Sequence, residues 1–396
     1  MNEGRRRRTV TVVGGGVYGM TAALELAQRG HDVTLVDAGR VPHPNAASTD
    51  ISKAVRMDYG DDAFYADLAR RAIDGWSAWN RAQQAEPLYH EVGILLLAAR
   101  PLERGGFEAD SFRLLGQRGI PVERLGPQTL ARRFPAWAGA SYPDGYFNPC
   151  AGFVESGRVV QWLARRAVAA GVRLREEARC SRLLEQGKRV TGVLLDSGER
   201  LSSDRVVVAC GAWTPFLVPQ VSELLRATAQ PVCHFRPAER GAFEGQRFPV
   251  WCADISGTGW YGFPLSRDGL LKVGHHGPGR PFAPGDEFVV TEDEKRACAE
   301  WVAATFRDRV GVPVALSRLC LYCDSRDGDF LIDHDPERQD LIVAAGDSGH
   351  GFKFAPLLGG IIADVVERKP NPDSGRFAWR HLGAARREQA RQRTAE

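Results

Sequence analysis

Two cysteines close together in the chain are the first residues whose spacing suggests chemistry. Cys320 and Cys323 have the C-x-x-C spacing that is typical of zinc sites and of dithiol redox pairs. A zinc site needs four ligands, and no second C-x-x-C or suitably spaced histidine pair is present. A reactive dithiol needs an exposed cysteine at a helix N-terminus, whereas residues 318–322 resemble a strand. We therefore predict no metal site, and two buried cysteines remain the plainest alternative.

Cationic side chains early in the chain form a second group with a suggestive spacing. Lys53 precedes Arg56 by one helical turn if residues 51–57 are helical, so both cations could face one site. An arginine fork can hold a carboxylate through two parallel hydrogen bonds. The alternative interpretation of Asp50, Lys53 and Arg56 is a charge ladder on the protein surface.

Two further lysines lie in unusual surroundings. Lys272 interrupts the otherwise apolar run 269–274, and Lys353 follows a glycine-rich segment that contains His350. A buried cation could stabilise a developing negative charge in a site that excludes water. The plainer alternatives are a lysine that extends from a sheet edge into water for Lys272, and a solvated loop lysine for Lys353.

The first forty residues show the complete pattern of a dinucleotide-binding βαβ unit. An apolar run at 9–13 leads into Gly14-Gly15-Gly16-Val17-Tyr18-Gly19. A helical pattern at 20–29 and a second apolar run at 31–36 follow, and the second run ends at Asp37. This context makes the glycine motif far more specific than the motif alone.

Each conserved part of such a unit has a physical role. Gly14 allows a tight turn, Gly16 lets the backbone approach a pyrophosphate, and Gly19 lets the helix pack on the strand. The helix N-terminus presents unpaired N–H groups to phosphates. Asp37, 18 residues after Gly19, can accept hydrogen bonds from ribose hydroxyls. The alternative is a glycine-rich turn that binds no ligand.

The rest of the chain must position these groups. Strand and helix patterns return at 155–215, with a hairpin signal across 190–203, and again at 340–368. The stretches between them are richer in aromatic residues, proline and strand-like segments. We expect an α/β fold, α+β overall, in which a Rossmann-like domain is assembled from discontinuous segments and a second domain with a mixed β-sheet is inserted.

Composition limits the possible classes of protein. The 396 residues carry 52 basic and 49 acidic side chains, a balance that argues against a nucleic-acid-binding surface. No apolar stretch reaches about 18 residues, so no membrane span is expected. Eight mostly scattered cysteines fit reduced thiols, so we expect a cytoplasmic protein.

Six segments, in order along the chain, resemble one known family: TVVGGGVYGMTAALELAQRGHDVTLVD, STDISKAVRMDYGDD, VVVACGAWT, WYGFPLSRDGLLKVGHH, SRLCLY and AAGDSGHGFKFAPLLGG. The family is the FAD-dependent amine oxidases of the D-amino-acid-oxidase superfamily. The resemblance is greatest to the monomeric sarcosine oxidase group, with fructosyl-amino-acid and pipecolate oxidases as neighbours. A generic Rossmann protein would share only the first segment.

The resemblance implies FAD as the cofactor and assigns it to one domain. The implied FAD-binding domain comprises 1–85, 146–219 and 321–396, and the substrate domain comprises 86–145 and 220–320. The cofactor-binding residues implied are Gly14, Gly16, Val17, Gly19, Asp37, Ala38, Ser48, Lys53, Cys210, Gly211, Trp213, Cys320, Gly346, Gly349, Gly351 and Lys353. Cys320 would form a thioether to a ring-methyl carbon of the flavin, and Cys323 would be incidental.

The same resemblance implies catalytic roles. Lys272 would activate dioxygen beside the flavin, and Lys353 with Arg56 would bind a substrate carboxylate. His276 and Tyr261 match a pocket histidine and tyrosine, although either could be an ordinary core residue. Sarcosine oxidases carry an arginine where Lys53 stands, and this departure puts sarcosine itself in doubt.

We therefore expect an oxidase of a secondary amine that carries a carboxylate, with dioxygen reduced to hydrogen peroxide. We also expect the protein to be a monomer whose partners are the small-molecule amine and dioxygen. Three alternatives remain: a dehydrogenase of the same fold with another electron acceptor, a biosynthetic amine oxidase that couples oxidation to ring closure or desaturation, and a flavin-binding module without turnover.

Overall fold

A six-stranded sheet carries the predicted βαβ unit in the computed structural model, which describes residues 7–83, 86–137, 142–306, 310, 313–381 and 390–392. The strand order is β20–β21–β13–β1–β2–β9, and all neighbours are parallel except β20 and β21. The strands are β1 (Thr9–Val13), β2 (Asp32–Val36), β9 (Arg173–Arg175), β13 (Arg205–Val208), β20 (Leu331–His334) and β21 (Leu341–Ala345). The apolar sequences of β1, β13 and β21 fit strands that are buried on both faces, whereas the edge strand β9 is Arg-Leu-Arg and largely exposed.

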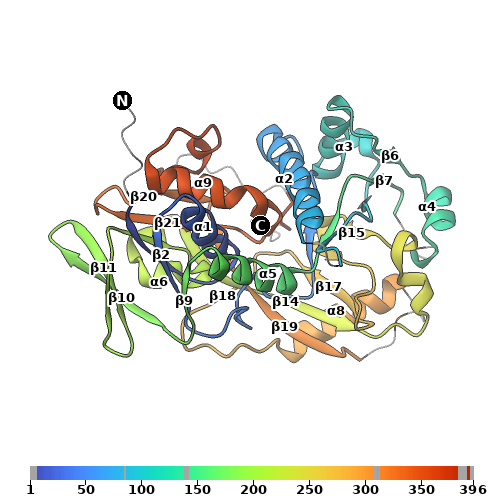
Figure 1. Ribbon diagram of the computed structural model, residues 1–396. Helices are drawn as coiled ribbons and strands as arrows, with labels where there is room; N and C mark the ends of the chain where they lie inside the picture. Colours follow the sequence, from blue (N-terminus) through green and yellow to red (C-terminus); the bar gives the residue numbers. More distant parts are fainter. Residues whose placement is uncertain are drawn as a thin grey trace.

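Two layers cover this sheet (Figure 1). Helices α1 (Val17–Gln28), α5 (Ser156–Ala169) and α9 (Ala355–Glu367) cover one face. An antiparallel meander of β10 (Cys180–Gln186), β11 (Arg189–Leu195) and β12 (Arg200–Ser202) covers the other, which confirms the predicted hairpin. Val10 and Val12 pack among the helices and Val13 packs toward the meander, as the two-residue period of a strand requires.

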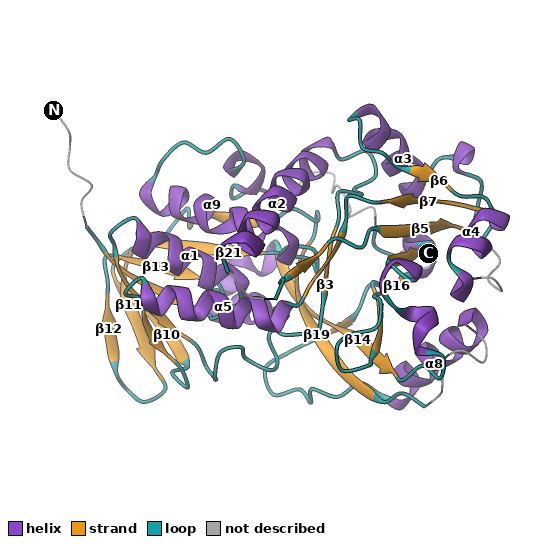
Figure 2. Ribbon diagram, turned by 45° about the vertical axis from the view of Figure 1, so that its right-hand side comes forward, coloured by secondary structure: helices purple, strands orange, loops and turns teal. Residues whose placement is uncertain are grey.

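A second, nine-stranded sheet lies at the other end of the molecule (Figure 2). Its main path is β18–β14–β17–β16–β15–β5–β7–β6, and β19 pairs with β14. The strands are β5 (Ile94–Ala98), β6 (Glu123–Arg124), β7 (Asp144–Asn148), β14 (Leu225–Phe235), β15 (Val250–Ala253), β16 (Trp260–Gly262), β17 (Leu271–His275), β18 (Arg280–Pro281) and β19 (Leu316–Ser325). Both sheets fit the expected α/β fold with an added mixed sheet.

Aromatic side chains fill the core beside the nine-stranded sheet. Trp137 and Trp251 meet edge to face with ring centroids 5.2 Å apart, and Phe306 packs against both. The helices at this end are α3 (Phe107–Gln117), α4 (Pro127–Arg133), α7 (Ile255–Thr258) and α8 (Glu292–Phe306). The domain boundaries stay a prediction, and β7 and β19 cross the predicted limits at residues 145 and 320.

Residues 53–55 form a strand, so the condition that residues 51–57 are helical is not met. This strand, β3 (Lys53–Val55), pairs with β8 (Gly152–Val154), which also pairs with β4 (Tyr89–His90). A seven-residue helix is shorter than the roughly 12–15 residues needed for stability in isolation, so pairing with β8 prevails. Side chains three positions apart in extended chain point to opposite sides, which separates Lys53 of β3 from Arg56, the residue that directly follows the strand.

Two helices complete the fold. Helix α2 (Ala63–Ala82) packs against α9, and α6 (Thr214–Leu217) follows the glycine-rich turn after β13. None of the described helices is long and apolar enough to cross a membrane.

Candidate cofactor and active site

A cavity of about 530 Å³ opens at the carboxyl ends of β1, β2, β13 and β21. In open α/β sheets this is the edge at which nucleotides bind. Most of the predicted cofactor residues line it, namely Gly14, Gly16, Val17, Asp37, Ala38, Ser48, Cys210, Gly211 and Trp213. The βαβ prediction and the cavity therefore coincide.

The glycine-rich turn at the cavity edge has no space for side chains. Gly14 has a φ of 108°, and a Cβ atom on it would lie 2.4 Å from the Ala209 carbonyl oxygen. A Cβ atom on Gly19 would lie 1.8 Å from the Gly14 oxygen, so α1 packs directly on the turn. Ser48 Oγ accepts a hydrogen bond of 2.9 Å from the Val17 amide at the start of α1.

Polar groups are placed in the cavity wall as a dinucleotide requires. The Asp37 carboxylate accepts hydrogen bonds from the amides of Gly15 (2.6 Å) and Gly39 (3.0 Å), which fix its orientation. Each of its oxygens retains a lone pair that could accept a ribose hydroxyl. The Tyr18 hydroxyl is buried, lines the cavity and has no hydrogen-bond partner among the described residues. The residues present fit a bound dinucleotide.

Strand β19 carries the predicted tether and passes beside this cavity, which its Leu321 lines. Cys320, Tyr322 and Asp324 share one face of the strand, because side chains alternate along it. Ala47 lines the cavity and packs against Cys320 and Tyr322. Cys320 is therefore close to the space in which the cofactor fits.

The two cysteines of the C-x-x-C motif are not arranged to form a disulfide or to bind one metal ion together. Cys320 and Cys323 lie three positions apart in an extended strand, so they face opposite sides, and both are free thiols. Within the described ranges, no group of three or more histidine, cysteine or acidic side chains is arranged to hold a metal ion.

A buried carboxylate, Asp50, joins the two lysines near the tether. Lys272 Nζ donates to Asp50 Oδ2 at 2.7 Å and to the Ser52 carbonyl oxygen at 2.5 Å. Lys53 Nζ lies 3.4 Å from the same carboxylate oxygen and donates to Cys320 Sγ at 3.2 Å. The four polar groups Asp50, Lys53, Lys272 and Cys320 thus form one cluster.

Burial and ion pairing act differently on the members of this cluster. Burial lowers the pKa of Lys272 to about 8, although Asp50 partly offsets this shift. Burial opposes the charge on Asp50, but Lys272 and Lys53 outweigh it and hold its pKa well below the usual value. Burial also lowers the pKa of the neighbouring His234 to about 4, so this imidazole is neutral near pH 7. The cluster keeps one fixed anion beside a lysine that titrates near neutral pH.

Arg56 and Lys353 converge on Tyr59. Lys353 Nζ donates to the Tyr59 hydroxyl at 2.9 Å and to the His350 carbonyl oxygen at 2.7 Å. The Arg56 guanidinium lies 5.1 Å from the centre of the Tyr59 ring. Both cations are buried. Lys53 of β3 thus extends toward Cys320, whereas Arg56, directly after β3, extends toward Lys353.

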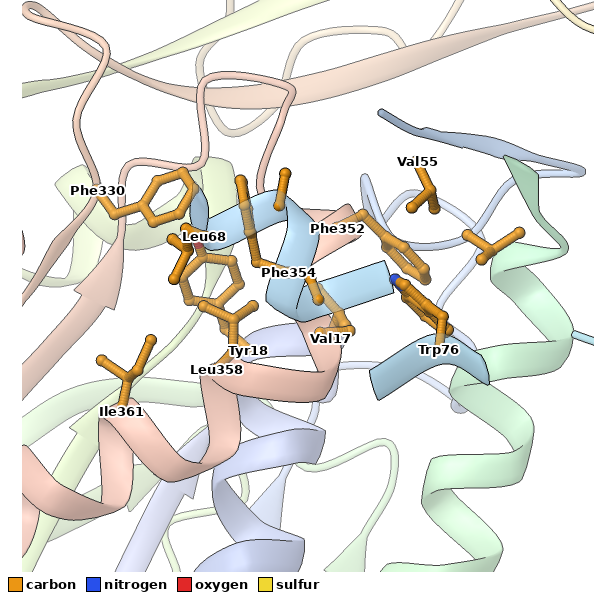
Figure 3. Packing of buried hydrophobic residues seen from close by; sticks show 14 of the residues in the cluster. Val17, Tyr18, Val55, Leu68, Trp76, Phe330, Phe352, Phe354, Leu358 and Ile361 are labelled. Carbon is orange, nitrogen blue, oxygen red and sulfur yellow. The ribbon is translucent and has the colours of Figure 1, made fainter. Parts of the chain in front are cut away.

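Apolar packing holds the loop that carries Lys353. Phe352 and Phe354 flank it and pack among side chains from α1, α2 and α9 (Figure 3). Trp76 of α2 stacks on Phe352, and its Nε1 donates to the Lys353 carbonyl oxygen at 2.7 Å. By fixing the backbone of Lys353, this packing limits where its ammonium group can lie.

Tyr261 and His276 both lie against Tyr322. The Tyr261 and Tyr322 hydroxyls share a hydrogen bond, and burial raises the pKa of both phenols above the usual value. The His276 ring centroid lies 6.0 Å from that of Tyr322. Gly349 faces the same tyrosine, since a Cβ atom on it would lie 2.3 Å from the Tyr322 ring. The pocket residues predicted from the sequence are thus brought together around Tyr322.

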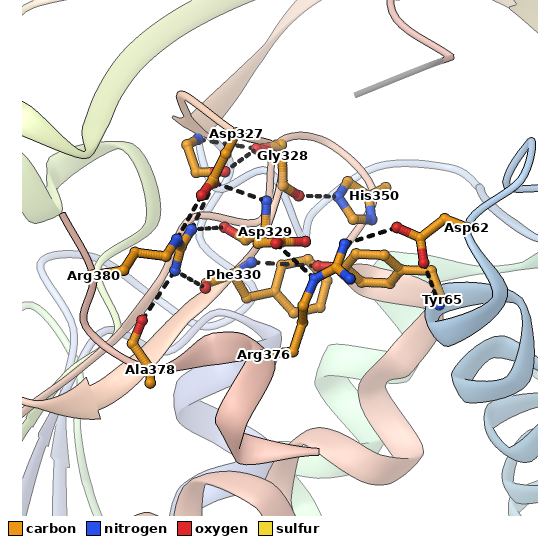
Figure 4. Close-up of polar contacts among 12 residues, drawn as sticks. Asp62, Tyr65, Asp327, Gly328, Asp329, Phe330, His350, Arg376, Ala378 and Arg380 are labelled. Atoms are coloured by element: carbon orange, nitrogen blue, oxygen red, sulfur yellow. Dashed lines mark hydrogen bonds and ion pairs between the residues drawn. The ribbon is translucent and has the colours of Figure 1, made fainter. Parts of the chain in front are cut away.

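His350 closes a second cavity, of about 400 Å³. Its ring nitrogens lie 3.1 Å from the Tyr59 hydroxyl and 3.0 Å from the Gly328 carbonyl oxygen. Two arginines fix the loop opposite: Arg376 pairs with Asp62 and Asp329, and Arg380 pairs with Asp327 (Figure 4). His350 therefore connects a rigid polar loop to Tyr59.

Several residues of the site were not assigned from the sequence, namely Asp50, Tyr59, His234, Tyr322 and Asp347. Tyr322 and Asp347 lie inside the segments that carry the family resemblance, so their positions offered a signal. Asp347 lines the larger cavity, and burial raises its pKa to about 6. Asp50 and Tyr59 also lie inside such a segment, STDISKAVRMDYGDD, in which Asp50 was noted only as part of a charge ladder. His234 follows no local pattern.

Comparison with known proteins identifies the class to which this fold and site belong. The sequence profile of the family "FAD dependent oxidoreductase" matches residues 9–365. The chain belongs to this family. This confirms the family resemblance and identifies the chain as an FAD-dependent oxidoreductase.

Individual relatives are similar along nearly their whole length. N-methyl-L-tryptophan oxidase of Salmonella arizonae is 29% identical over 381 residues, covering 91% of this chain and 95% of the relative. Monomeric sarcosine oxidase of a Bacillus species is 26% identical over 366 residues, covering 90% and 91%. The crystal structure of fructosyl amine:oxygen oxidoreductase (Amadoriase I) from Aspergillus fumigatus superposes with a TM-score of 0.76 at 25% identity, covering 94% and 90%.

Proposed function

We propose that the protein oxidises the C–N bond of a secondary amine that carries a carboxylate, with dioxygen as the electron acceptor. The observation that carries this proposal is the convergence of two buried cations, Arg56 and Lys353, on Tyr59. Two buried cations that lie around one phenol suit an anionic ligand placed between them. The names of the relatives, which act on N-methyl-L-tryptophan, sarcosine and fructosyl amines, agree with an amino-acid substrate.

The chain's own residues would bind and orient this substrate. Arg56 and Lys353 hold its carboxylate, and fixing two points limits the rotation of the C–H bond that must break. Tyr261, Tyr322 and His276 surround the amine, which must be neutral to give up a hydride equivalent. When bound, FAD would supply the acceptor for a hydride equivalent, two electrons and one proton from the carbon atom, and would pass the electrons to dioxygen; the amine becomes an imine once its N–H proton is also lost.

Lys272 would act in the oxygen half of the reaction. Dioxygen acquires negative charge when it accepts its first electron, and a preorganised cation in a dry site stabilises that charge. Lys272 is 2% exposed and is held in place by Asp50 and by the Ser52 carbonyl oxygen. Protons and two electrons then convert dioxygen to hydrogen peroxide.

Reduction of the flavin without oxygen tests the proposed substrate class. N-methyl amino acids, cyclic imino acids and glycated amino acids are mixed anaerobically with the holoprotein, and the flavin absorbance is followed. We expect at least one class to bleach the flavin, and the corresponding amine without a carboxylate to do so far more slowly. Failure of all three classes at millimolar concentration would refute an amino-acid substrate.

We also propose that Cys320 forms a covalent bond to the flavin. Lys53 Nζ donates a hydrogen bond of 3.2 Å to its sulfur, which fixes the position of the Cys320 side chain. After acid precipitation we expect yellow protein from the wild type and from Cys323→Ala, and colourless protein with free flavin from Cys320→Ala. Yellow Cys320→Ala precipitate would contradict the assignment. The cytoplasmic location and the monomeric state stay predictions.

A further inference from the structure

A segment far along the chain, Ala390–Gln392, packs into the site. Ala390 is 3% exposed, joins the main hydrophobic core and lines the smaller cavity together with Tyr59 and His350. Two residues later, the Gln392 amide donates to the His276 carbonyl oxygen at 3.0 Å. The segment therefore runs between the carboxylate-binding side and the histidine side of the pocket.

Arg391 anchors this segment to β19. Its Nη1 and Nη2 donate to Asp324 Oδ2 and Oδ1 at 2.7 and 2.6 Å, and Nη2 also donates to the Ser348 carbonyl oxygen at 3.0 Å. The Asp324 side chain is 1% exposed and also accepts a hydrogen bond of 2.6 Å from Thr228 Oγ1. Such a bidentate, buried pair fixes both the position and the plane of a guanidinium.

The anchor lies on the face of β19 that bears the tether and the pocket tyrosine. Asp324, Tyr322 and Cys320 occupy alternate positions of the strand, so their side chains share that face. The Arg391 guanidinium lies 5.8 Å from the centre of the Tyr322 ring. Tyr322 in turn contacts Tyr261 and His276. Arg391 thus packs beside Tyr322, next to the residues proposed to surround the amine, and lines neither of the two cavities described above.

We propose that Arg391, held by Asp324, closes this side of the pocket and restricts the enzyme to amines with small substituents. A guanidinium held by three hydrogen bonds can move aside only when those bonds break. A substrate with an indole-sized group would require this movement, whereas one with a methyl group would not. The proposal rests on the amine oxidase function above and extends it to the size of the substrate.

Binding of carboxylates that cannot be oxidised tests the proposal without turnover. Acetate and indole-3-acetate are titrated into the holoprotein, and the dissociation constants are read from the change in flavin absorbance. The preference is the ratio of the two dissociation constants. In Arg391→Ala we expect it to shift toward indole-3-acetate by about tenfold, because the larger ligand no longer has to break a charged hydrogen-bond pair, which is worth about that factor. Arg391→Lys should shift it partly, since lysine cannot bind in the bidentate manner.

Arg338→Ala is a matched control for a merely structural effect. Arg338 donates through Nε and Nη2 to one carboxylate oxygen of Asp335, and the two side chains are 12% and 3% exposed, against 13% and 1% for Arg391 and Asp324. This control should leave the preference unchanged. An unchanged preference in Arg391→Ala, or an equal shift in Arg338→Ala, would overturn the proposal.

Two further measurements distinguish failure of the role proposed for Arg391 from failure of the proposed amine oxidase function. Asp324→Asn removes the same ion pair from the other side, so it should reproduce the shift even if Arg391→Ala fails to fold. With oxidisable substrates, Arg391→Ala should lower the KM for N-methyl-L-tryptophan relative to sarcosine, with kcat less affected. If no amine reduces the wild-type flavin, the proposed function fails, while the carboxylate titrations still decide the role of Arg391.

Discussion

At the scale of single residues, Asp50 organises the charges near the tether. It accepts a hydrogen bond from Lys272 and lies 3.4 Å from Lys53, while Lys53 also contacts Cys320. One buried carboxylate thus compensates the charges of Lys53 and Lys272, which have different proposed roles. Removal of either lysine leaves Asp50 with less compensation, so each substitution at this cluster needs a control that retains the charge.

Lys272→Met is expected to slow the oxygen half of the reaction selectively. Loss of a preorganised group that stabilises a developing charge typically costs roughly 10²–10³ in rate. Reduction of the flavin by the amine should change little, because Lys272 contacts Asp50 and Ser52 rather than Arg56 or Lys353. Stopped-flow measurement of reduction and reoxidation separates the two steps. Lys272→Arg is the charge-retaining control, and equal slowing of both steps would contradict the assignment.

The reoxidation rate should fall as the pH rises through about 8. Lys272 is a cation below its pKa and neutral above it, so the stabilising charge is lost at high pH. In Asp50→Asn the anion that raises the Lys272 pKa is gone, so the fall should move to lower pH. Reoxidation rates measured across this range report the shift. A profile unchanged by Asp50→Asn would show that another group titrates.

At the scale of elements, the site depends on which face of a strand each side chain occupies. On β19 the alternation places Cys320 with Tyr322 and separates it from Cys323. At β3 the same alternation separates Lys53 from Arg56, which directly follows the strand. Local patterns were sufficient to predict the βαβ unit and β19, but not β3, whose three residues are extended because β8 lies beside them.

Helix α2 should contribute to the position of Lys353 through a single hydrogen bond. Trp76→Phe removes the donor to the Lys353 carbonyl oxygen, and a buried acceptor left unpaired costs about 1–3 kcal/mol in free energy of unfolding. We also expect a higher KM for the carboxylate substrate. Trp79→Phe, on the same helix and 5.0 Å from the Trp76 ring, is the control in urea unfolding and kinetics. Equal effects of both substitutions would contradict this role.

At the scale of the whole molecule, the site lies where the two large sheets approach each other. The cofactor cavity belongs to the six-stranded sheet, whereas Lys272, Tyr261 and Cys320 come from the nine-stranded sheet. The family motifs in the sequence were sufficient to propose these residues as members of the site. It does not reveal the contact of Asp50 with Lys272 or of Arg391 with Asp324, because residues far apart in the chain meet only through the fold.

The most direct test of the proposed function is the amount of hydrogen peroxide formed per amine consumed in air. An amine that bleaches the flavin anaerobically is incubated aerobically with the holoprotein, and amine and peroxide are measured in the same sample. An oxidase transfers both electrons of each amine to one dioxygen molecule, so one peroxide per amine is expected. Consumption of the amine only with an added quinone or carrier protein, and without peroxide, would show that the protein is a dehydrogenase instead.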